Sequence, residues 1–341
     1  MEKFQVLGPT NSAIHLLLLA STAPEIAALA DVDGKVLLVD PTGKVRSERI
    51  CPDVADVALM QCGQSTLLAI AEPAGVTLVH DLDGQRKVDR LSEHEGRATG
   101  VALFGTEEMP TWIVSADERG NVLRCNAVAR TSVAPRRLHR KAVTRLVATR
   151  LADGRDAFLS ASDDRDVLVC EVAGGEVVAR FASHAGWIEQ AVPLSHGQRL
   201  WGVAVVDRVG LTIWEVETGL AAGRVTGKAT ADLATVWHPA IGSVVSFATP
   251  DAVVLWSLQG INSIAQPARD VVRASAIAAD SKGQPTVYAA AGRTILHYEG
   301  GNGFVDTGIR FPAPILRWLP WKSTSGALVV LEDGSIWNAD W

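Results

Sequence analysis

The chain has 341 residues, of which 48% are apolar and 21% are charged, and its formal net charge is −6. This composition is close to the globular average and excludes wholesale disorder. The acidic net charge argues against a general nucleic-acid binder, because contacts with many phosphates need a dominant basic surface.

Neither a membrane segment nor a secretory leader is expected. The apolar run at residues 14–20 is too short to span a bilayer, and Glu2 and Lys3 cancel where a secretory signal needs a basic start. The cysteines form no Cys-x-x-Cys pair and no short ladder of spacings, which argues against a zinc site or a disulfide framework. We expect free, mostly buried thiols in a reducing cytoplasm, at Cys51, Cys62, Cys125 and Cys170.

A short apolar strand recurs along the whole chain at steps of 41 to 45 residues. The clearest copy lies in residues 156–171, where two apolar runs flank a tight acidic turn and read as one hairpin. A period of this length with several strands per unit is typical of β-propellers. The recurring strand ends at Val39, His80, Cys125, Cys170, Trp214, Trp256, His297 and Ala339.

We therefore predict an all-β chain, a single closed β-propeller of four-stranded blades. In chain order, the first five units are expected to contain strands at 14–20, 25–30, 35–40 and 45–50; 54–60, 65–71, 76–81 and 87–91; 98–104, 111–116, 121–126 and 132–138; 142–150, 157–162, 167–171 and 176–182; and 188–194, 200–206, 211–215 and 220–225. The next two contain strands at 232–237, 243–248, 252–257 and 261–265, and at 272–278, 285–290, 294–298 and 304–309.

The last unit, residues 315–341, supplies only three strands, at 315–318, 327–331 and 335–340. Residues 2–7 have no partner of their own, so we predict that they form the outer strand of the last blade. This pairing closes the ring, because the N–H and C=O groups of an open edge would otherwise stay unpaired. The count gives eight blades, with seven as the alternative if the irregular first unit is misread; the repeats are 14–50, 54–91, 98–138, 142–182, 188–225, 232–265, 272–309 and 315–341.

With these repeats the chain resembles degenerate, bacterial-type WD-repeat β-propellers over essentially its full length. The tryptophan position of the motif is kept at Trp214 and Trp256, and single histidines, His94, His139 and His184, stand where the family has Gly-His. The position after the tryptophan, acidic in the family, holds Asp40, Asp81, Asn126, Glu171, Glu215 and Asp340.

The resemblance implies a buried, structural hydrogen-bonded relay in each regular blade. His139, Asp164 and either Ser160 or Ser162 fit it, with Cys170 in place of the tryptophan. His184 with Asp207 and Trp214, and His94 with Asp117 and Ser115, fit it more loosely because the turn aspartate is displaced.

Serine, histidine and aspartate are also the residue types of a hydrolytic triad. No Gly-x-Ser-x-Gly elbow, phosphate-binding loop or His-Glu-x-x-His spacing accompanies them, and similar sets recur in several repeats, so we predict no enzyme and no cofactor. Asp163, Asp164 and Asp166 could hold a hard cation, although Arg165 among them favours a solvated turn. The rival prediction is an enzyme or small-molecule binder with a pocket at the central channel, where the innermost strands carry Asp56, Arg145, Glu189, Asp232, Arg273 and Arg317.

In a propeller, the loop before each first strand and the turn between the second and third strands emerge on one face. Arginines around one tryptophan have the composition of an interaction hot spot, and the alternative is an ordinary charged rim. The basic run at residues 136–141 could touch an acidic protein or RNA. The dense set Trp318, Trp321, Trp337 and Trp341 is expected to be mainly core, with Trp321 as an exposed anchor in the alternative. The candidate partner-binding residues of units three to five are Arg97, Arg119, Arg140, Lys141, Arg165, Trp187 and Arg208.

These observations predict a non-catalytic scaffold or sensor module that presents its loop faces to a protein or peptide. The resemblance adds that the partner could be a separately encoded signalling ATPase, since no ATPase motif is present in this chain. We expect the protein to be cytoplasmic and monomeric by itself. Its Ala-, Val- and Arg-rich, Lys-poor composition is typical of bacteria with GC-rich genomes.

Overall fold

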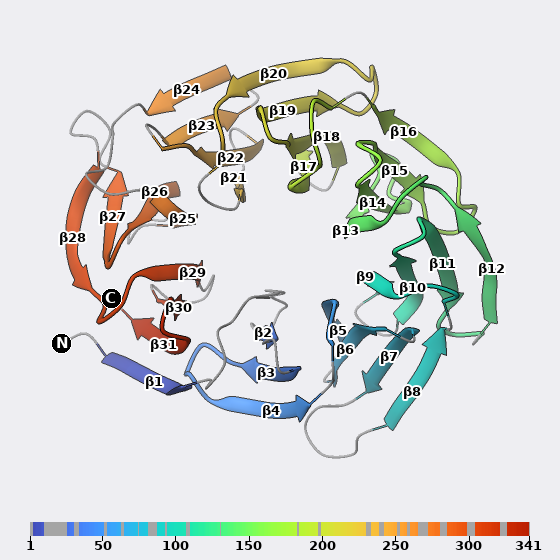
Figure 1. The fold of residues 1–341 in the computed structure, drawn as a ribbon, viewed down its shortest axis with the longest axis horizontal. Helices are drawn as coiled ribbons and strands as arrows, with labels where there is room; N and C mark the ends of the chain where they lie inside the picture. The colour runs from blue at the N-terminus through green and yellow to red at the C-terminus, as the bar shows by residue number, and fades with distance from the viewer. Residues whose placement is uncertain are drawn as a thin grey trace.

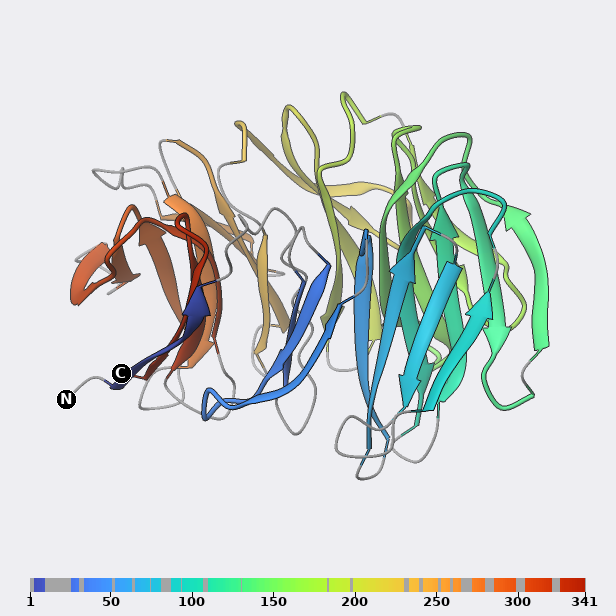
Figure 2. The same ribbon diagram turned by 60° about the horizontal axis from the view of Figure 1, so that its bottom comes forward.

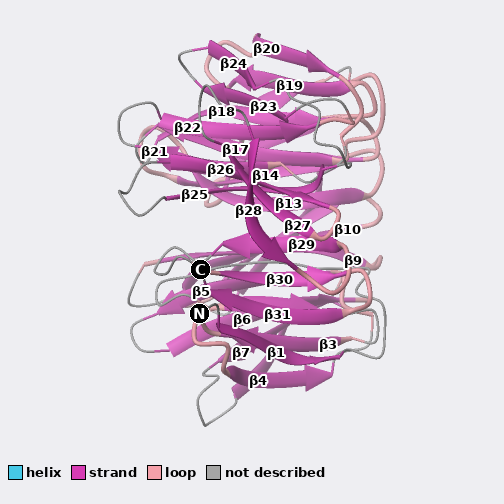
Figure 3. Cartoon of the chain, turned by 90° about the vertical axis from the view of Figure 1, so that its left-hand side faces the viewer, coloured by secondary structure: helices cyan, strands magenta, loops and turns pink. Residues whose placement is uncertain are grey.

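The computed structural model describes most of the chain as strands and connecting turns. All regular secondary structure in the described part is strand (Figure 3). The predicted strand at 14–20, Asp81, Asp232, Trp321 and Trp341 lie outside the described residues. The described ranges are 3–9, 26–30, 34–50, 53–62, 65–73, 75–80, 87–92, 94–106, 110–129, 131–182, 184–196, 199–229, 233–238, 242–250, 253–257, 260–264, 272–279, 285–298, 304–320 and 326–340.

The described strands form antiparallel sheets, which we number in chain order. Sheet 1 has three described strands, β2 (Ala27–Ala30), β3 (Lys35–Val39) and β4 (Val45–Ile50). Sheet 2 contains β5 (Asp56–Cys62), β6 (Ser65–Glu72), β7 (Gly75–His80) and β8 (Lys87–Ser92). Sheet 3 contains β9 (Ala98–Gly105), β10 (Pro110–Asp117), β11 (Asn121–Asn126) and β12 (Thr131–Arg137). Sheet 4 contains β13 (Val143–Arg150), β14 (Asp156–Ser162), β15 (Val167–Glu171) and β16 (Val177–Phe181).

The remaining sheets repeat this order. Sheet 5 contains β17 (Gln190–His196), β18 (Arg199–Val206), β19 (Gly210–Glu215) and β20 (Ala221–Thr226). Sheet 6 contains β21 (Ala234–His238), β22 (Gly242–Ala248), β23 (Val253–Ser257) and β24 (Gly260–Ile264). Sheet 7 contains β25 (Val272–Ala279), β26 (Pro285–Ala291), β27 (Thr294–Tyr298) and β28 (Phe304–Arg310). Sheet 8 contains β29 (Ile315–Pro320), β30 (Ala327–Leu331), β31 (Ser335–Asp340) and the N-terminal strand β1 (Lys3–Pro9).

The sheets stand around a ring, with the first strand of each innermost and the fourth outermost (Figure 1). The strands run between the two faces of the ring, so the connections gather on those faces (Figure 2). Burial follows this arrangement, because a middle strand is covered by the sheets on either side. Every residue of β15 is buried, whereas every residue of the outer strand β12 is exposed.

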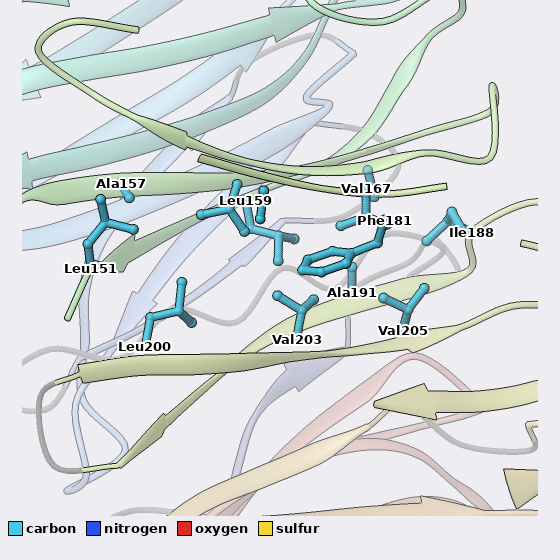
Figure 4. Packing of buried hydrophobic residues seen from close by; sticks show 13 residues of the cluster. Leu151, Ala157, Leu159, Val167, Phe181, Ile188, Ala191, Leu200, Val203 and Val205 are labelled. Atoms are coloured by element: carbon cyan, nitrogen blue, oxygen red, sulfur yellow. The ribbon is translucent and has the colours of Figure 1, made fainter. Parts of the chain in front are cut away.

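Neighbouring sheets are joined by apolar cores such as the one between sheets 4 and 5 (Figure 4). Leu159 and Phe181 of sheet 4 pack there against Val203 of sheet 5. Phe181 also stacks on Trp214, with 5.5 Å between the ring centroids. Burial of an aromatic side chain of this size stabilises the fold by about 1.5–3 kcal/mol. The tryptophan position of the repeat therefore packs back onto the preceding sheet.

The two chain ends meet in sheet 8. Strand β1 pairs antiparallel with β31, from Lys3 opposite Asp340 to Pro9 opposite Ser335. The sequence predicted this added strand at residues 2–7, and the structure describes it at Lys3–Pro9.

Sheet 8 also packs against sheet 1, since residues of β30 and β31 share a core with residues of β2 and β3. The side-chain amide of Asn338 donates a hydrogen bond of 2.9 Å to the carbonyl oxygen of Pro41. The first and last sheets are therefore neighbours.

The C-terminal tryptophans that the structure describes are packing residues, as expected. Trp318 is buried and meets Tyr288 edge-on, with ring centroids 5.9 Å apart. Trp337 meets Phe311 of the preceding sheet at 6.0 Å.

Candidate functional site

In sheet 4 a buried histidine joins the loop before the first strand to the turn between the second and third strands. His139 is 2% exposed, and its Nε2 lies 2.9 Å from Ser160 Oγ while its Nδ1 lies 3.2 Å from Asp164 Oδ1. Asp164 Oδ2 also accepts a hydrogen bond of 2.8 Å from the backbone N–H of Arg140. The structure thus brings together three residues of the expected relay. Its serine is Ser160, because the hydroxyl of Ser162 instead accepts the backbone N–H of Asp164.

Sheet 3 contains an equally complete set, although the sequence predicted a looser one. His94 Nε2 lies 2.7 Å from Ser115 Oγ, and its Nδ1 lies 3.4 Å from Asp117 Oδ2. The other oxygen of Asp117 accepts the backbone N–H groups of Arg119 and Asn121 at 2.9 Å and 2.8 Å. One carboxylate therefore fixes both the turn and the loop before β9.

In sheet 5 the expected chain from Asp207 through His184 to Trp214 is wrong in one link. His184 Nε2 accepts a hydrogen bond of 3.1 Å from the indole N–H of Trp214, as the relay requires. Its Nδ1 lies 3.0 Å from the backbone oxygen of Arg165 in sheet 4 rather than bonding Asp207. Asp207 accepts the backbone N–H groups of Ala185 and of its own turn instead. The displaced aspartate thus ties the loop to the turn, and the histidine ties sheet 5 to sheet 4.

The serine and histidine side chains of these sets are buried. Ser115 is 2% exposed and Ser160 is fully buried, so no substrate can reach either hydroxyl. Burial lowers the pKa of His94, His139 and His184 against the opposing influence of neighbouring groups, so the imidazoles are neutral at neutral pH. A neutral, buried histidine whose two ring nitrogens are both hydrogen-bonded locks a loop in place.

The buried thiol of Cys170 is equally unreactive. It stands at the tryptophan position of sheet 4 and is unpaired, as is the buried Cys125 of sheet 3. Burial raises the pKa of the Cys170 thiol to about 12. The thiolate, which is the nucleophilic form, is therefore absent at neutral pH.

Sequence reasoning left the residue after the tryptophan position without a physical role of its own. In the structure it caps the turn between the third and fourth strands. Asp40 Oδ1 accepts the backbone N–H of Thr42 at 3.0 Å, Asn126 Oδ1 accepts that of Ala129 at 2.8 Å, and Glu171 Oε2 accepts that of Gly174 at 2.6 Å. The signal was present in the sequence, because small or β-turn residues follow each of these acceptors.

The arginines of sheet 3 lie exposed on the loop face but have acidic neighbours there. Arg97 Nη2 lies 3.8 Å from Asp53 Oδ1, and Arg119 Nη1 lies 3.4 Å from Glu95 Oε2. Both pairs are solvent-exposed, so each contributes only about 0–1 kcal/mol to stability. They nevertheless neutralise this part of the face.

The candidate residues of sheets 4 and 5 are exposed as well, and they lie beside the locked loops. Trp187 is 52% exposed, and the guanidinium carbon of Arg208 lies 4.0 Å from its ring centroid, in a cation–π contact. Arg140, Lys141 and Arg165 surround the turn that Asp164 and His139 hold. The seven predicted residues therefore share one face in two groups, a neutralised one on sheet 3 and a basic one on sheets 4 and 5.

The basic run at residues 136–141 is divided by its hydrogen bonds. Arg136 donates to the carbonyl oxygen of Gly175 in sheet 4 at 2.5 Å. Arg137 donates to the carbonyl oxygens of His139 and Arg140 at 3.3 Å and 3.2 Å. Only part of the run is thus available as a basic surface, which is narrower than a general RNA-binding face requires.

The acidic turn does not form a metal site. The described residues hold no group of three or more histidine, cysteine or acidic side chains that could bind a metal ion. Asp164 is engaged by His139 and by backbone N–H groups, and Asp166 pairs with Arg180.

Of the polar residues predicted at the channel, Asp56 has the most unusual surroundings. Its two oxygens accept the backbone N–H groups of Val57 and of Val101 in the next sheet, both at 3.0 Å. Burial raises the pKa of this carboxyl to about 7, although these bonds and Arg145 act in the opposite direction. Asp56 thus joins sheets 2 and 3, and Arg145 and Glu189 are exposed.

Comparison with known proteins shows the fold. No protein-family model and no curated protein matches the sequence. Among solved structures, Saccharomyces cerevisiae Sqt1 matches with a TM-score of 0.71 and 11% identity, over 97% of this chain and 96% of Sqt1. The computationally designed protein Ika8 matches with a TM-score of 0.64 and 16% identity, over 98% and 100% of the two chains. A chain of a mitotic checkpoint complex matches with a TM-score of 0.61 and 12% identity, over 99% and 91%.

The protein therefore has the fold of WD-repeat β-propellers, built from repeated four-stranded antiparallel sheets. No helix suited to crossing a membrane occurs in the part of the chain that the structure describes.

Proposed function

We propose that this protein is a non-catalytic scaffold or sensor module that recognises a protein or peptide through the loop face of sheets 3 to 5. The observation that carries the proposal is the exposed Trp187 with Arg208 over its ring, set among loops that buried histidines and aspartates hold. Aromatic and arginine side chains dominate interaction hot spots, and a rigid surface loses little entropy when it binds.

The same proposal covers the assembly and location of the protein. The described strands fall into eight sheets, and sheets 1 and 8 share a core, which supports a closed eight-bladed ring. We take the protein to act as a monomer in the cytoplasm, with a separately encoded signalling ATPase among the candidate partners.

The test is copurification of the tagged full-length protein from its native cell under mild lysis, read by mass spectrometry. Trp187→Ala and Arg140→Ala are compared with the natural protein after circular dichroism shows that both are folded. We expect a stoichiometric protein partner that either substitution depletes. Unchanged retention of that partner by both variants would refute the site, and the absence of any partner would favour a ligand pocket at the channel, tested next by thermal shift.

A further inference from the structure

The exposed cations of sheets 4 and 5 form one continuous patch across the junction of the two sheets. His184, in the loop before β17, bonds the backbone oxygen of Arg165, so the turn of sheet 4 touches the loop that carries Trp187. Arg208 reaches Trp187 from the next turn. We call this surface the sheet 4–5 patch, and it consists of Arg140, Lys141, Arg165, Trp187, Arg208 and Val209.

At the surface of the patch, exposed positive side chains outnumber exposed negative ones. Its four cations make no ion pair with any residue that the structure describes, in contrast to Arg97 and Arg119 on sheet 3. Three carboxylates of these turns face inward: Asp164 lies against His139, Asp166 pairs with Arg180, and Asp207 accepts backbone N–H groups. Two further carboxylates nearby, at positions 163 and 189, leave the positive charge in the majority.

Two apolar side chains lie within this basic surface. Trp187 is 52% exposed and Val209, next to Arg208, is 53% exposed. Large exposed apolar side chains surrounded by charged ones mark sites where another molecule is bound. A nucleic acid could stack a base on Trp187 but has no aliphatic group to pack on Val209, whereas a peptide can present apolar and acidic groups together.

Arg165 supplies an independent observation, because its backbone is in the left-handed region, with φ at 72°. The same turn position is glycine in three other sheets, at Gly34, Gly120 and Gly334, with φ between 81° and 86°. A side chain there strains the backbone. The arginine is nevertheless present and exposed, and its guanidinium makes no ion pair with the residues that the structure describes, which indicates a role for the side chain outside the fold.

Gly186 leaves the space in which the side chain of Arg208 lies against Trp187. A Cβ atom at this position would lie 3.0 Å from both Cβ and Cγ of Arg208. The missing side chain therefore lets the stem of Arg208 lie flat, with its guanidinium over Trp187.

Resting on the proposed function, we propose that the sheet 4–5 patch binds an acidic peptide segment of a partner protein, in which Asp or Glu side chains flank an apolar anchor. The anchor packs on Trp187 and Val209, and the carboxylates pair with the four cations. Recognition thus depends on charge at this junction and not on the neutralised arginines of sheet 3.

The test uses the full-length protein immobilised for selection of displayed random peptides at low salt, followed by anisotropy measurements on the recovered peptides. We expect enriched sequences with excess Asp and Glu around an apolar residue. Arg165→Gly and Arg208→Ala should weaken their binding about tenfold each, as truncation of a hot-spot side chain does, and added salt should weaken it further. Arg165→Gly suits the turn, so loss of folding does not confound it. Arg155→Ala is the matched control, because Arg155 is exposed and ion-paired with Asp153 in the turn between β13 and β14, at the other end of the strands, and we expect little change from it.

Four results would overturn the proposal in different ways. Enriched peptides without acidic excess that still depend on Trp187 would refute the acidic partner and leave the proposed function standing. Acidic peptides that bind the Arg165→Gly, Arg208→Ala and natural proteins equally well would place recognition elsewhere on the face. A single-stranded oligonucleotide of mixed sequence that displaces the peptides at equal affinity would mean that the patch binds phosphate. If no peptide is enriched and no partner copurifies, the proposed function fails with it.

Discussion

Replacing His139 tests whether the buried histidine stabilises the loop before β13, because the expected loss in free energy of unfolding follows from its hydrogen bonds. His139→Ala removes the hydrogen bonds of the imidazole to Ser160 and Asp164, at 2.9 Å and 3.2 Å. Each bond contributes about 1 kcal/mol net, and the hydroxyl of Ser160, left unpaired in a fully buried position, adds about 1–3 kcal/mol. We therefore expect a loss of about 3–5 kcal/mol in the free energy of unfolding.

The loss is measured by urea unfolding followed through tryptophan fluorescence, and by calorimetry. An unfolding entropy of about 2.1 cal/mol/K per residue over 341 residues converts it into a fall of about 4–7 °C in Tm. Ser160→Ala combined with His139→Ala is the control, because the double variant leaves no orphaned hydroxyl and should lose less than the sum of the single variants. A cost below about 1 kcal/mol for His139→Ala, or strict additivity, would refute the reasoning.

Three further predictions follow from the same contacts. Burial lowers the pKa of the three loop histidines, so the unfolded chain binds more protons than the folded chain as the pH falls. The urea midpoint should therefore fall as the pH drops through about 6.5 and below, and a flat profile would contradict this. The pKa shift of Asp56 is upward, because its folded pKa of about 7 lies above the ordinary 3.8. Ionisation of Asp56 therefore destabilises the fold increasingly between these two pH values, by at most about 4 kcal/mol. Asp56→Asn should raise the free energy of unfolding more at pH 8 than at pH 4. Gly120→Ala should lower the free energy of unfolding by about 2–4 kcal/mol, because its Cβ would lie 2.3 Å from the carbonyl oxygen of His139 at a φ of +86°. Gly154 has a similar φ of +89° but nothing within 4 Å of its Cβ position, so Gly154→Ala should cost about 1 kcal/mol. Equal losses for the two variants would refute the contact at Gly120.

Much of the fold was readable from the sequence because its strands are short, apolar and regularly spaced. The predicted strands at 121–126, 167–171 and 335–340 coincide with β11, β15 and β31. Strand ends were predicted less accurately where the apolar–polar alternation stops gradually at a loop. The first strand of sheet 5, for example, was expected to begin at Ile188, whereas β17 begins at Gln190. A strand end is set by pairing with its neighbour, which the local sequence does not contain.

The relays were only partly predictable because they depend on contacts between sheets. The spacing of His139, Ser160 and Asp164 within one unit was enough to group them. His184 bonds the backbone oxygen of Arg165 in the preceding sheet. Every residue has a backbone carbonyl, so the sequence does not indicate which one accepts this bond. For the same reason the sequence grouped Arg97 with Arg208, whereas ion pairing neutralises the first and leaves the second against Trp187.

The most direct test of the central claim is hydrogen–deuterium exchange on the complex with the copurified partner. The account predicts that binding protects backbone amides of the loop face, in residues 137–142, 162–166, 184–189 and 206–210. The turns at the other end of the third strands, residues 127–129, 172–176 and 216–220, should exchange at the same rate in the free and bound protein. Protection confined to those turns would contradict the claim that the loop face of sheets 3 to 5 recognises the partner.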